Sequence, residues 1–124
     1  MTIAVSLISL VDDDQSVRES LPDLLRQFGY TVRAFAAAHA FLESDAVEQT
    51  RCLILDVAMP GMSGPDLQQE LARRGLRIPI IFITAQSNET LRAKLLAQGA
   101  ADFLVKPFDD TVFLEALKKA LRES

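Results

Sequence analysis

The chain has 124 residues, of which 49% are hydrophobic and 24% charged, and its formal net charge is -4. This length and composition are typical of one globular domain with a single core, so we expect one domain over residues 1–124. A negative charge without a basic stripe argues against nucleic-acid binding by this domain. No apolar stretch is long enough to span a membrane, and residues 1–11 lack the basic start and cleavage site of a secretory signal.

The single cysteine, Cys52, cannot form an internal disulfide. A lone thiol suits the reducing cytoplasm, where we expect the protein to reside. Cys52 lies in an apolar run and is interpreted as a small buried hydrophobe.

Short β-rich runs alternate with amphipathic stretches along the whole chain. Several runs are apolar on both faces, as expected for interior strands of a parallel sheet that helices cover on both sides. The predicted strands are 6–11, 31–35, 52–56, 78–83 and 102–105.

Helical periodicity fills the intervals between these strands. In the first helix, apolar residues from Val17 to Phe28 recur at helical spacing and stop before Gly29, a plausible C-terminal cap. Pro22 lies inside this pattern and predicts a kink or a late helix start. The other predicted helices are 37–43, 63–74, which Ser63 would cap, 88–98 and 110–122.

Five β-α units with right-handed crossovers predict an α/β fold: a doubly wound parallel sheet with five helices. We expect the strand order 2-1-3-4-5. In this order the strand order reverses between strands 1 and 3, and ligands bind at such a switch point.

Acidic residues end these two strands. Asp12, Asp13 and Asp14 follow the first apolar run, and Asp56 ends the third. Crowded carboxylates repel one another and need a proton or a cation for compensation. Oxygen ligands favour a hard ion such as Mg²⁺. Asp14 directly precedes the first helix and is interpreted as its cap.

Two more strand ends carry polar groups. Thr84 ends the fourth strand and Lys106 follows the fifth. Either residue alone is common at such a position, but together with the acids they supply what phosphoryl transfer needs. A carboxylate can attack phosphorus, a cation and an ammonium can neutralise the oxygens, and a hydroxyl can donate a hydrogen bond to one of them.

These residues resemble the receiver domains of bacterial two-component response regulators, and the resemblance covers essentially the whole chain. The matching motifs are the acidic motif at 11–14, the phosphorylation loop at 55–64, the switch threonine motif at 83–85 and the lysine motif at 106–108.

The resemblance implies a role for each residue. Asp56 would accept a phosphoryl group from the phosphohistidine of a partner histidine kinase or phosphotransfer protein. Asp13, Asp56 and the backbone carbonyl of Ala58 would bind Mg²⁺ directly, and Asp12 would act through a bound water. Lys106 would pair with Asp56 and later with the phosphoryl oxygens. The peptide bond after Lys106 is usually cis in this family.

The resemblance also implies a switch. Thr84 would move toward the phosphoryl group and Phe103 would turn inward, remodelling the face of the fourth helix, fifth strand and fifth helix. Within that face, the resemblance implies the fourth helix and fifth strand as the surface of a phosphorylation-dependent homodimer. Many relatives have tyrosine at position 103, so only the packing part of the switch carries over, and a static aromatic is the competing interpretation. Ala58 and Gln86 depart from common versions near the path of hydrolytic water, which leaves the phosphoryl lifetime open.

Two other classes of protein share parts of this pattern. Haloacid dehalogenase phosphatases need a second acid two residues after the nucleophile, but that residue is Ala58 here. Flavodoxin-like carriers need a phosphate-cradling loop after the first strand, where Asp12 to Asp14 would repel phosphate. We therefore expect a phosphoacceptor that catalyses only its own phosphorylation and dephosphorylation, without enzymatic turnover. It would act on a downstream protein as a free-standing receiver, or as the regulatory half of a longer DNA-binding transcription factor.

Overall fold

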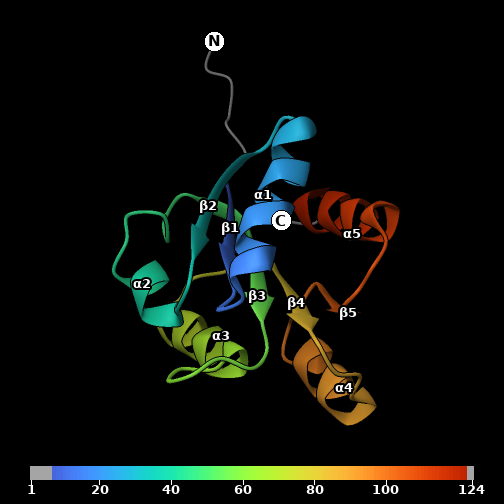
Figure 1. Ribbon diagram of the computed structural model, residues 1–124. Coiled ribbons are helices and arrows are strands. Elements are labelled where there is room, and N and C mark those ends of the chain that lie inside the picture. The colour runs from blue at the N-terminus through green and yellow to red at the C-terminus, as the bar shows by residue number, and fades with distance from the viewer. Residues whose placement is uncertain (1–6, 123–124) are drawn as a thin grey trace.

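The computed structural model describes residues 7–122, which form a five-stranded parallel sheet with helices on both faces (Figure 1). The order of the strands is β2-β1-β3-β4-β5, and all four neighbouring pairs are parallel. The predicted fold class and strand order are therefore confirmed. The strands are β1 (Leu7–Val11), β2 (Thr31–Phe35), β3 (Thr50–Asp56), β4 (Ile80–Thr84) and β5 (Asp102–Val105).

One helix follows each strand, and the helices divide between the two faces of the sheet. One hydrophobic core contains buried side chains of α1 and α5, and the other contains those of α2, α3 and α4. The helices are α1 (Gln15–Gln27), α2 (Ala38–Leu42), α3 (Gly64–Arg73), α4 (Glu89–Ala97) and α5 (Asp110–Arg122).

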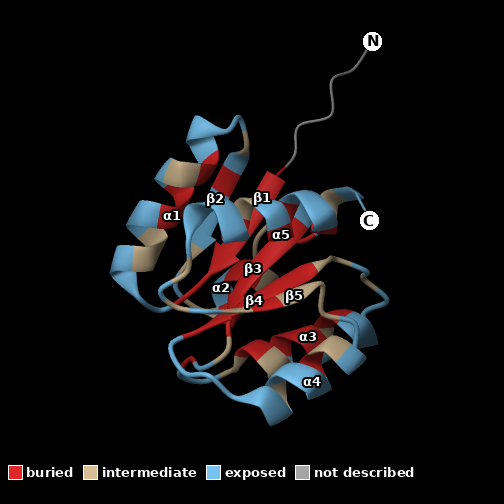
Figure 2. Cartoon of the chain, turned by 90° about the vertical axis from the view of Figure 1, so that its right-hand side faces the viewer, coloured by how far each residue is buried: buried red, intermediate tan, exposed pale blue. Residues whose placement is uncertain are grey.

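The central strands are buried, whereas the helices expose their outer sides (Figure 2). In β3, Leu53 and Leu55 enter the core under α2, α3 and α4, while Cys52 and Ile54 enter the core under α1 and α5. This division follows from the alternation of side chains along a strand. It explains why the run is apolar at successive positions: both faces of the strand are covered.

Helix α1 differs from the sequence prediction in two respects. It begins at Gln15 and includes Pro22, so the late start is wrong. Pro22 is buried beside Leu21 and Leu25, and this burial stabilises the helix against the loss of one backbone donor. Phe28 forms the C-cap and is 55% exposed, so it does not continue the buried face.

Strand β4 begins at Ile80, two residues later than expected, and extends through Thr84. Pro79 has no N–H group for a sheet ladder, although its carbonyl oxygen accepts a hydrogen bond from Leu53 at 2.9 Å. Strand β3 begins at Thr50, two residues early, and the expected start of the first strand at Ser6 lies outside the described residues. None of the helices within residues 7–122 combines the length and apolar character required to cross a membrane.

Candidate functional site

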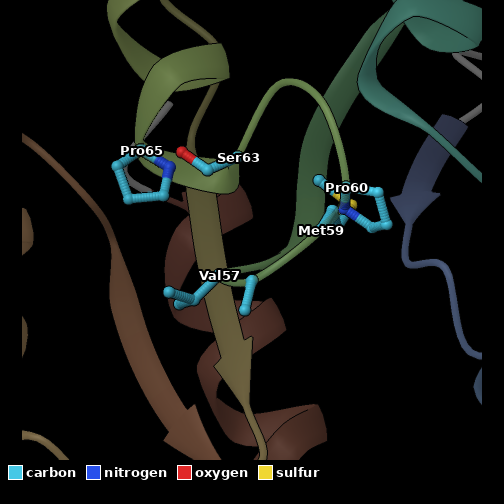
Figure 3. A pocket seen from close by; sticks show the side chains of 6 residues that line it. Val57, Met59, Pro60, Ser63 and Pro65 are labelled. Carbon is cyan, nitrogen blue, oxygen red and sulfur yellow. The ribbon is translucent and has the colours of Figure 1, made fainter.

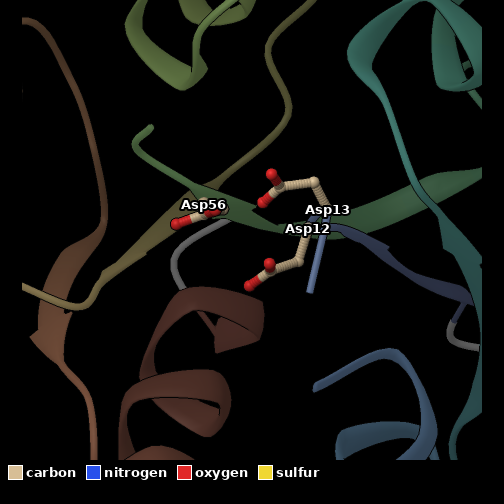
Figure 4. Close-up of side chains that lie close together, drawn as sticks. All are labelled: Asp12, Asp13 and Asp56. Atoms are coloured by element: carbon tan, nitrogen blue, oxygen red, sulfur yellow. The ribbon is translucent and has the colours of Figure 1, made fainter. Parts of the chain in front are cut away.

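Three carboxylates converge where β1 and β3 end (Figure 4). Asp12 and Asp13 follow β1, and Asp56 is the last residue of β3. Because these two strands are direct neighbours, oxygen atoms from the three side chains lie within 4.8 Å of one another. Asp12 is fully buried, Asp56 is buried and Asp13 is exposed to solvent. The residues that the sequence placed at one sheet edge therefore form one cluster.

Backbone and side-chain hydrogen bonds hold Asp12 in place. Its Oδ1 accepts a hydrogen bond from the backbone N–H of Asp14 at 2.9 Å. Arg18 of α1 donates from Nη1 to the carbonyl oxygen of Asp12 at 3.0 Å. Arg18 was not among the residues predicted from the sequence, although a basic residue one turn into a helix that starts beside an acidic cluster was a usable signal. Asp14 caps α1 through Ser16, as predicted.

Lys106 supplies the positive charge of the cluster. Its Nζ donates to Asp12 Oδ2 at 2.9 Å and lies 3.8 Å from Asp56 Oδ1. The closer partner is thus Asp12, whereas the resemblance implied Asp56. A fully buried carboxylate has the greater need of a charged partner, which accounts for this preference. The peptide bond between Lys106 and Pro107 is cis.

The cluster has three acids and a single lysine, and this excess of acidic groups affects the pKa of Asp56. Burial, followed by the charge of Asp12, raises the pKa of Asp56 to about 7, and a hydrogen bond with Asp13 acts in the same direction. Lys106 opposes this rise only in part. Burial alone would lower the pKa of Lys106, but its hydrogen bond to Asp12 and the surrounding carboxylates raise it overall.

This donor set fits a hard divalent cation. Oxygen ligands from three acids stand close together, and their excess negative charge favours either a bound proton or a metal ion. The residues are therefore suited to Mg²⁺, as expected from the sequence.

Thr84 lies on a strand, and Ala58 lies in a loop, that borders the acidic cluster. Thr84 is buried at the end of β4, and its hydroxyl accepts a hydrogen bond from the N–H of Gln86 at 3.3 Å. The backbone N–H of Lys106 donates to the carbonyl oxygen of Thr84 at 2.7 Å, so these two motifs are directly connected. Ala58 is exposed in the loop after β3.

That loop forms a shallow pocket of about 630 Å³ beside the cluster, lined by six residues (Figure 3). Ser63 ends the loop with a capping box: its hydroxyl accepts from the N–H of Asp66, and the Asp66 carboxylate accepts from the N–H of Ser63. The pocket residues are Val57, Ala58, Met59, Pro60, Ser63 and Pro65.

Gly64 brings the start of α3 against the backbone of the acidic strand. Its N–H donates to the carbonyl oxygen of Val57 at 3.0 Å. A Cβ atom at this position would collide with the carbonyl oxygen of Asp56. Glycine is therefore required by close packing. Gly64 belongs to the motif predicted from the sequence, but this contact was not predicted.

Phe103 of β5 is buried, with an exposed fraction of 5%. It lies in the same hydrophobic core as Phe82 of β4 and Leu95 of α4. Its ring is thus already buried in this structure, which fits both an inward switch position and a static aromatic. The movement itself stays a prediction.

Comparison with known proteins identifies the class of domain to which this fold and this acidic site belong. Residues 8–118 match the family model described as the response regulator receiver domain. The chain belongs to this family.

Among curated relatives, the chain is 44% identical over 115 residues to nodulation protein W of Bradyrhizobium diazoefficiens, covering 93% of this chain and 51% of that protein. It is 41% identical over 122 residues to the response regulator protein TodT of Pseudomonas putida, covering 98% and 54%. The chain thus spans about half the length of these relatives.

Solved structures show the same similarity. The response regulator StyR matches with a TM-score of 0.89 and 43% identity, covering 97% of this chain and 61% of that one. The structure named FixJ-N matches with a TM-score of 0.86 and 34% identity, covering 98% of both chains. A BeF3-activated DrrB receiver domain matches with a TM-score of 0.84 and 26% identity, covering 95% of this chain and 98% of that one.

Proposed function

We propose that this receiver domain is a Mg²⁺-dependent phosphoacceptor in which Asp56 takes a phosphoryl group from a histidine kinase or phosphotransfer protein. The observation that carries the proposal is the convergence of Asp12, Asp13 and Asp56, with their oxygens within 4.8 Å, beside the ammonium of Lys106. Asp13, Asp56 and the Ala58 carbonyl would hold the ion, with Asp12 acting through a water. When bound, the ion supplies positive charge that offsets the negative phosphoryl oxygens.

In the proposed reaction, a deprotonated oxygen of Asp56 attacks the phosphorus of the donor phosphohistidine. The new P–O bond forms as the P–N bond breaks, and the imidazole leaves with a proton from solvent. Lys106 can shift from Asp12 toward the transferred oxygens, because it already lies 3.8 Å from Asp56. The Thr84 hydroxyl donates to one of these oxygens.

The acyl phosphate would be lost by attack of water on phosphorus, which returns Asp56 to its carboxylate. Ala58 and Gln86 flank the proposed path of that water and would set the lifetime. Inorganic phosphate leaves in this step, and both phosphorylation and dephosphorylation take place on the domain's own side chain.

Incubation with acetyl phosphate and Mg²⁺ tests the phosphoacceptor directly. Intact mass spectrometry should show the gain of one phosphoryl group, and chelation of the metal should abolish it. Asp56→Asn should not gain the group, whereas the exposed Asp109→Asn should match the unmodified sequence. Phosphorylation that persists in Asp56→Asn would contradict the proposal.

Phosphorylation would act on the face formed by α4, β5 and α5. Thr84 ends the strand beside β5, and its displacement would change the packing around Phe103. Val105 on β5 and Val112 on α5 are 37% and 48% exposed, and these apolar side chains suit a protein partner or a homodimer. Sedimentation velocity with and without beryllofluoride should show larger species only in the treated sample, and an identical distribution would argue against dimer formation.

The lengths of the relatives favour a second way in which the domain could control its output. The chain is 41% identical to the transcriptional regulatory protein TdiR of Thauera aromatica, covering 94% of this chain and 51% of that protein. We propose, as the alternative to a free-standing receiver, that the domain is the regulatory half of a longer DNA-binding transcription factor. Sequencing of the intact reading frame distinguishes the two. Both alternatives place the domain in the cytoplasm, in keeping with the buried free thiol of Cys52.

A further inference from the structure

A second hollow lies at the opposite edge of the sheet from the acidic cluster. It is bordered by Ile80 at the amino end of β4 and by Ala101 just before β5. Residues of α3, of the turn between α4 and β5, and of α5 form its walls. Its volume of about 910 Å³ falls in the range of small-molecule sites. We call this hollow the amino-edge groove.

Gln68 of α3 gives the amino-edge groove an unusual property. Its side chain lines the groove and is only 8% exposed, and its carboxamide oxygen Oε1 is buried without a hydrogen-bond partner. It is the single buried side-chain polar atom without a partner that the described residues contain. Buried acceptors in native proteins are normally satisfied, so this oxygen at the wall of a groove is available to a donor from a ligand or from a water molecule.

The charge of the groove is also one-sided. Arg77 and Lys119 line it, no acidic residue does, and neither cation forms an ion pair with another residue of the described chain. This occurs in a chain whose formal net charge is -4. Two free cations in a concave surface attract an anion. Leu71, Leu76 and Ile78 add apolar side chains to the lining of the groove.

We propose that the amino-edge groove binds a small amphipathic organic anion that carries an N–H or O–H donor. The donor would pair with Gln68 Oε1, the anionic group would lie between Arg77 and Lys119, and the apolar body would pack on the leucine and isoleucine side chains. The proposal does not depend on phosphorylation, because the groove and the acidic cluster lie at opposite edges of the sheet.

N-acetyl-leucine is a suitable probe, since it has one carboxylate, one amide N–H and an apolar side chain. Titration into ¹⁵N-labelled protein at millimolar concentrations should give saturable NMR shifts at the amides of Gly75, Gly99 and Ala100, which line the groove. N-acetyl-N-methyl-leucine, which lacks the donor, and N-acetyl-leucine methyl ester, which lacks the charge, should each bind about tenfold more weakly. Asp56→Asn should bind the probe like the unmodified protein.

Variants separate binding from folding. Gln68→Leu keeps the volume and removes the acceptor, so it should lower the affinity about tenfold without lowering the melting temperature. Arg77→Gln, at an exposed position, should also weaken binding and reduce its dependence on salt.

Three results would overturn the proposal. One is the absence of saturable shifts at the groove, with only an ordered water on Gln68 in a crystal soaked with the probe. Another is equal binding by Gln68→Leu or by the N-methyl compound. The third is a marked fall in the melting temperature of Gln68→Leu, which would show that the oxygen already has a partner inside the fold.

Discussion

At the scale of single residues, the position of Asp56 makes its carboxyl group hard to ionise. It is buried beside the carboxylate of Asp12, and Lys106 compensates only part of this cost. A pKa of about 7 means that proton and metal compete for the same oxygens near neutral pH. Acceptance of a phosphoryl group requires that the proton leave first, because only the carboxylate is an effective nucleophile.

This raised pKa predicts a pH dependence of stability in metal-free protein. The folded state holds the proton up to about pH 7, whereas the unfolded chain releases it near the ordinary value of 3.8. The contribution of Asp56 is therefore neutral below about pH 4, and its ionisation lowers the free energy of unfolding progressively as pH rises from about 4 to 7. At about 1.4 kcal/mol per pKa unit, this loss in the free energy of unfolding is at most about 4 kcal/mol.

Urea denaturation across this pH range measures the effect, with chelator present throughout. Asp56→Asn should show a flatter stability profile than the unmodified sequence and should be the more stable protein at pH 8. Parallel profiles for the two proteins would show that Asp56 titrates normally.

Lys106 is predicted to support both folding and switching. Its removal in Lys106→Ala leaves the buried Asp12 carboxylate unpaired, which should cost roughly 3 kcal/mol in the free energy of unfolding. Switching should be impaired more than metal binding. Paired Mg²⁺ titrations with and without beryllofluoride can measure this difference, and equal losses in the two titrations would contradict it. Lys106→Arg, which keeps the charge, should recover part of the stability.

At the scale of elements, the junction of β3 and α3 depends on the contact between Gly64 and Asp56. Gly64→Ala should destabilise the protein by about 2 kcal/mol through overpacking, and it should slow phosphorylation because the displaced backbone carries Asp56. Gly75→Ala is the matched control, since Gly75 has a φ of +75° and nothing within 4 Å of an added Cβ. It should cost about 1 kcal/mol from backbone strain and leave phosphorylation unchanged. Equal phosphorylation rates in the two variants would exclude the contact as a functional one.

The sequence was sufficient to predict the elements whose signal is local. Runs such as Leu53 to Leu55 are apolar on both faces, so their burial between helices could be inferred, and Ser63 and Asp66 predicted a helix start. The predicted start of β4 was wrong, because the hydrophobic run begins before Pro79, which has no N–H group for the sheet. The prediction also failed at Phe28, since a helical period does not show where the covering surface ends.

At the scale of the whole molecule, strand order explains why most of the site could be predicted. The carboxyl ends of parallel strands share one edge, so acids at the ends of β1 and β3 had to meet once that order was correct. Contacts that depend on side-chain geometry could not be predicted. Examples are the preference of Lys106 for Asp12, the hydrogen bond from Arg18 and the unpaired Gln68 oxygen, because each depends on side-chain positions that the local sequence pattern does not determine.

Mg²⁺ should stabilise the entire fold, because a ligand that binds only the folded state raises its free energy of unfolding. The melting temperature should rise as Mg²⁺ is added, and most of this gain should be lost in Asp13→Ala. Differential scanning calorimetry measures both proteins at matched ionic strength. The same metal response in the variant would remove Asp13 from the binding site.

The most direct test of the central claim is to locate the phosphoryl group. After reaction with acetyl phosphate and Mg²⁺, borohydride reduces an aspartyl phosphate to homoserine, which tandem mass spectrometry can place in the sequence. We predict homoserine at position 56 and at no other position. Homoserine at position 12 or 13 with position 56 unchanged, or none despite bound Mg²⁺, would contradict the assignment of Asp56 as the phosphoacceptor.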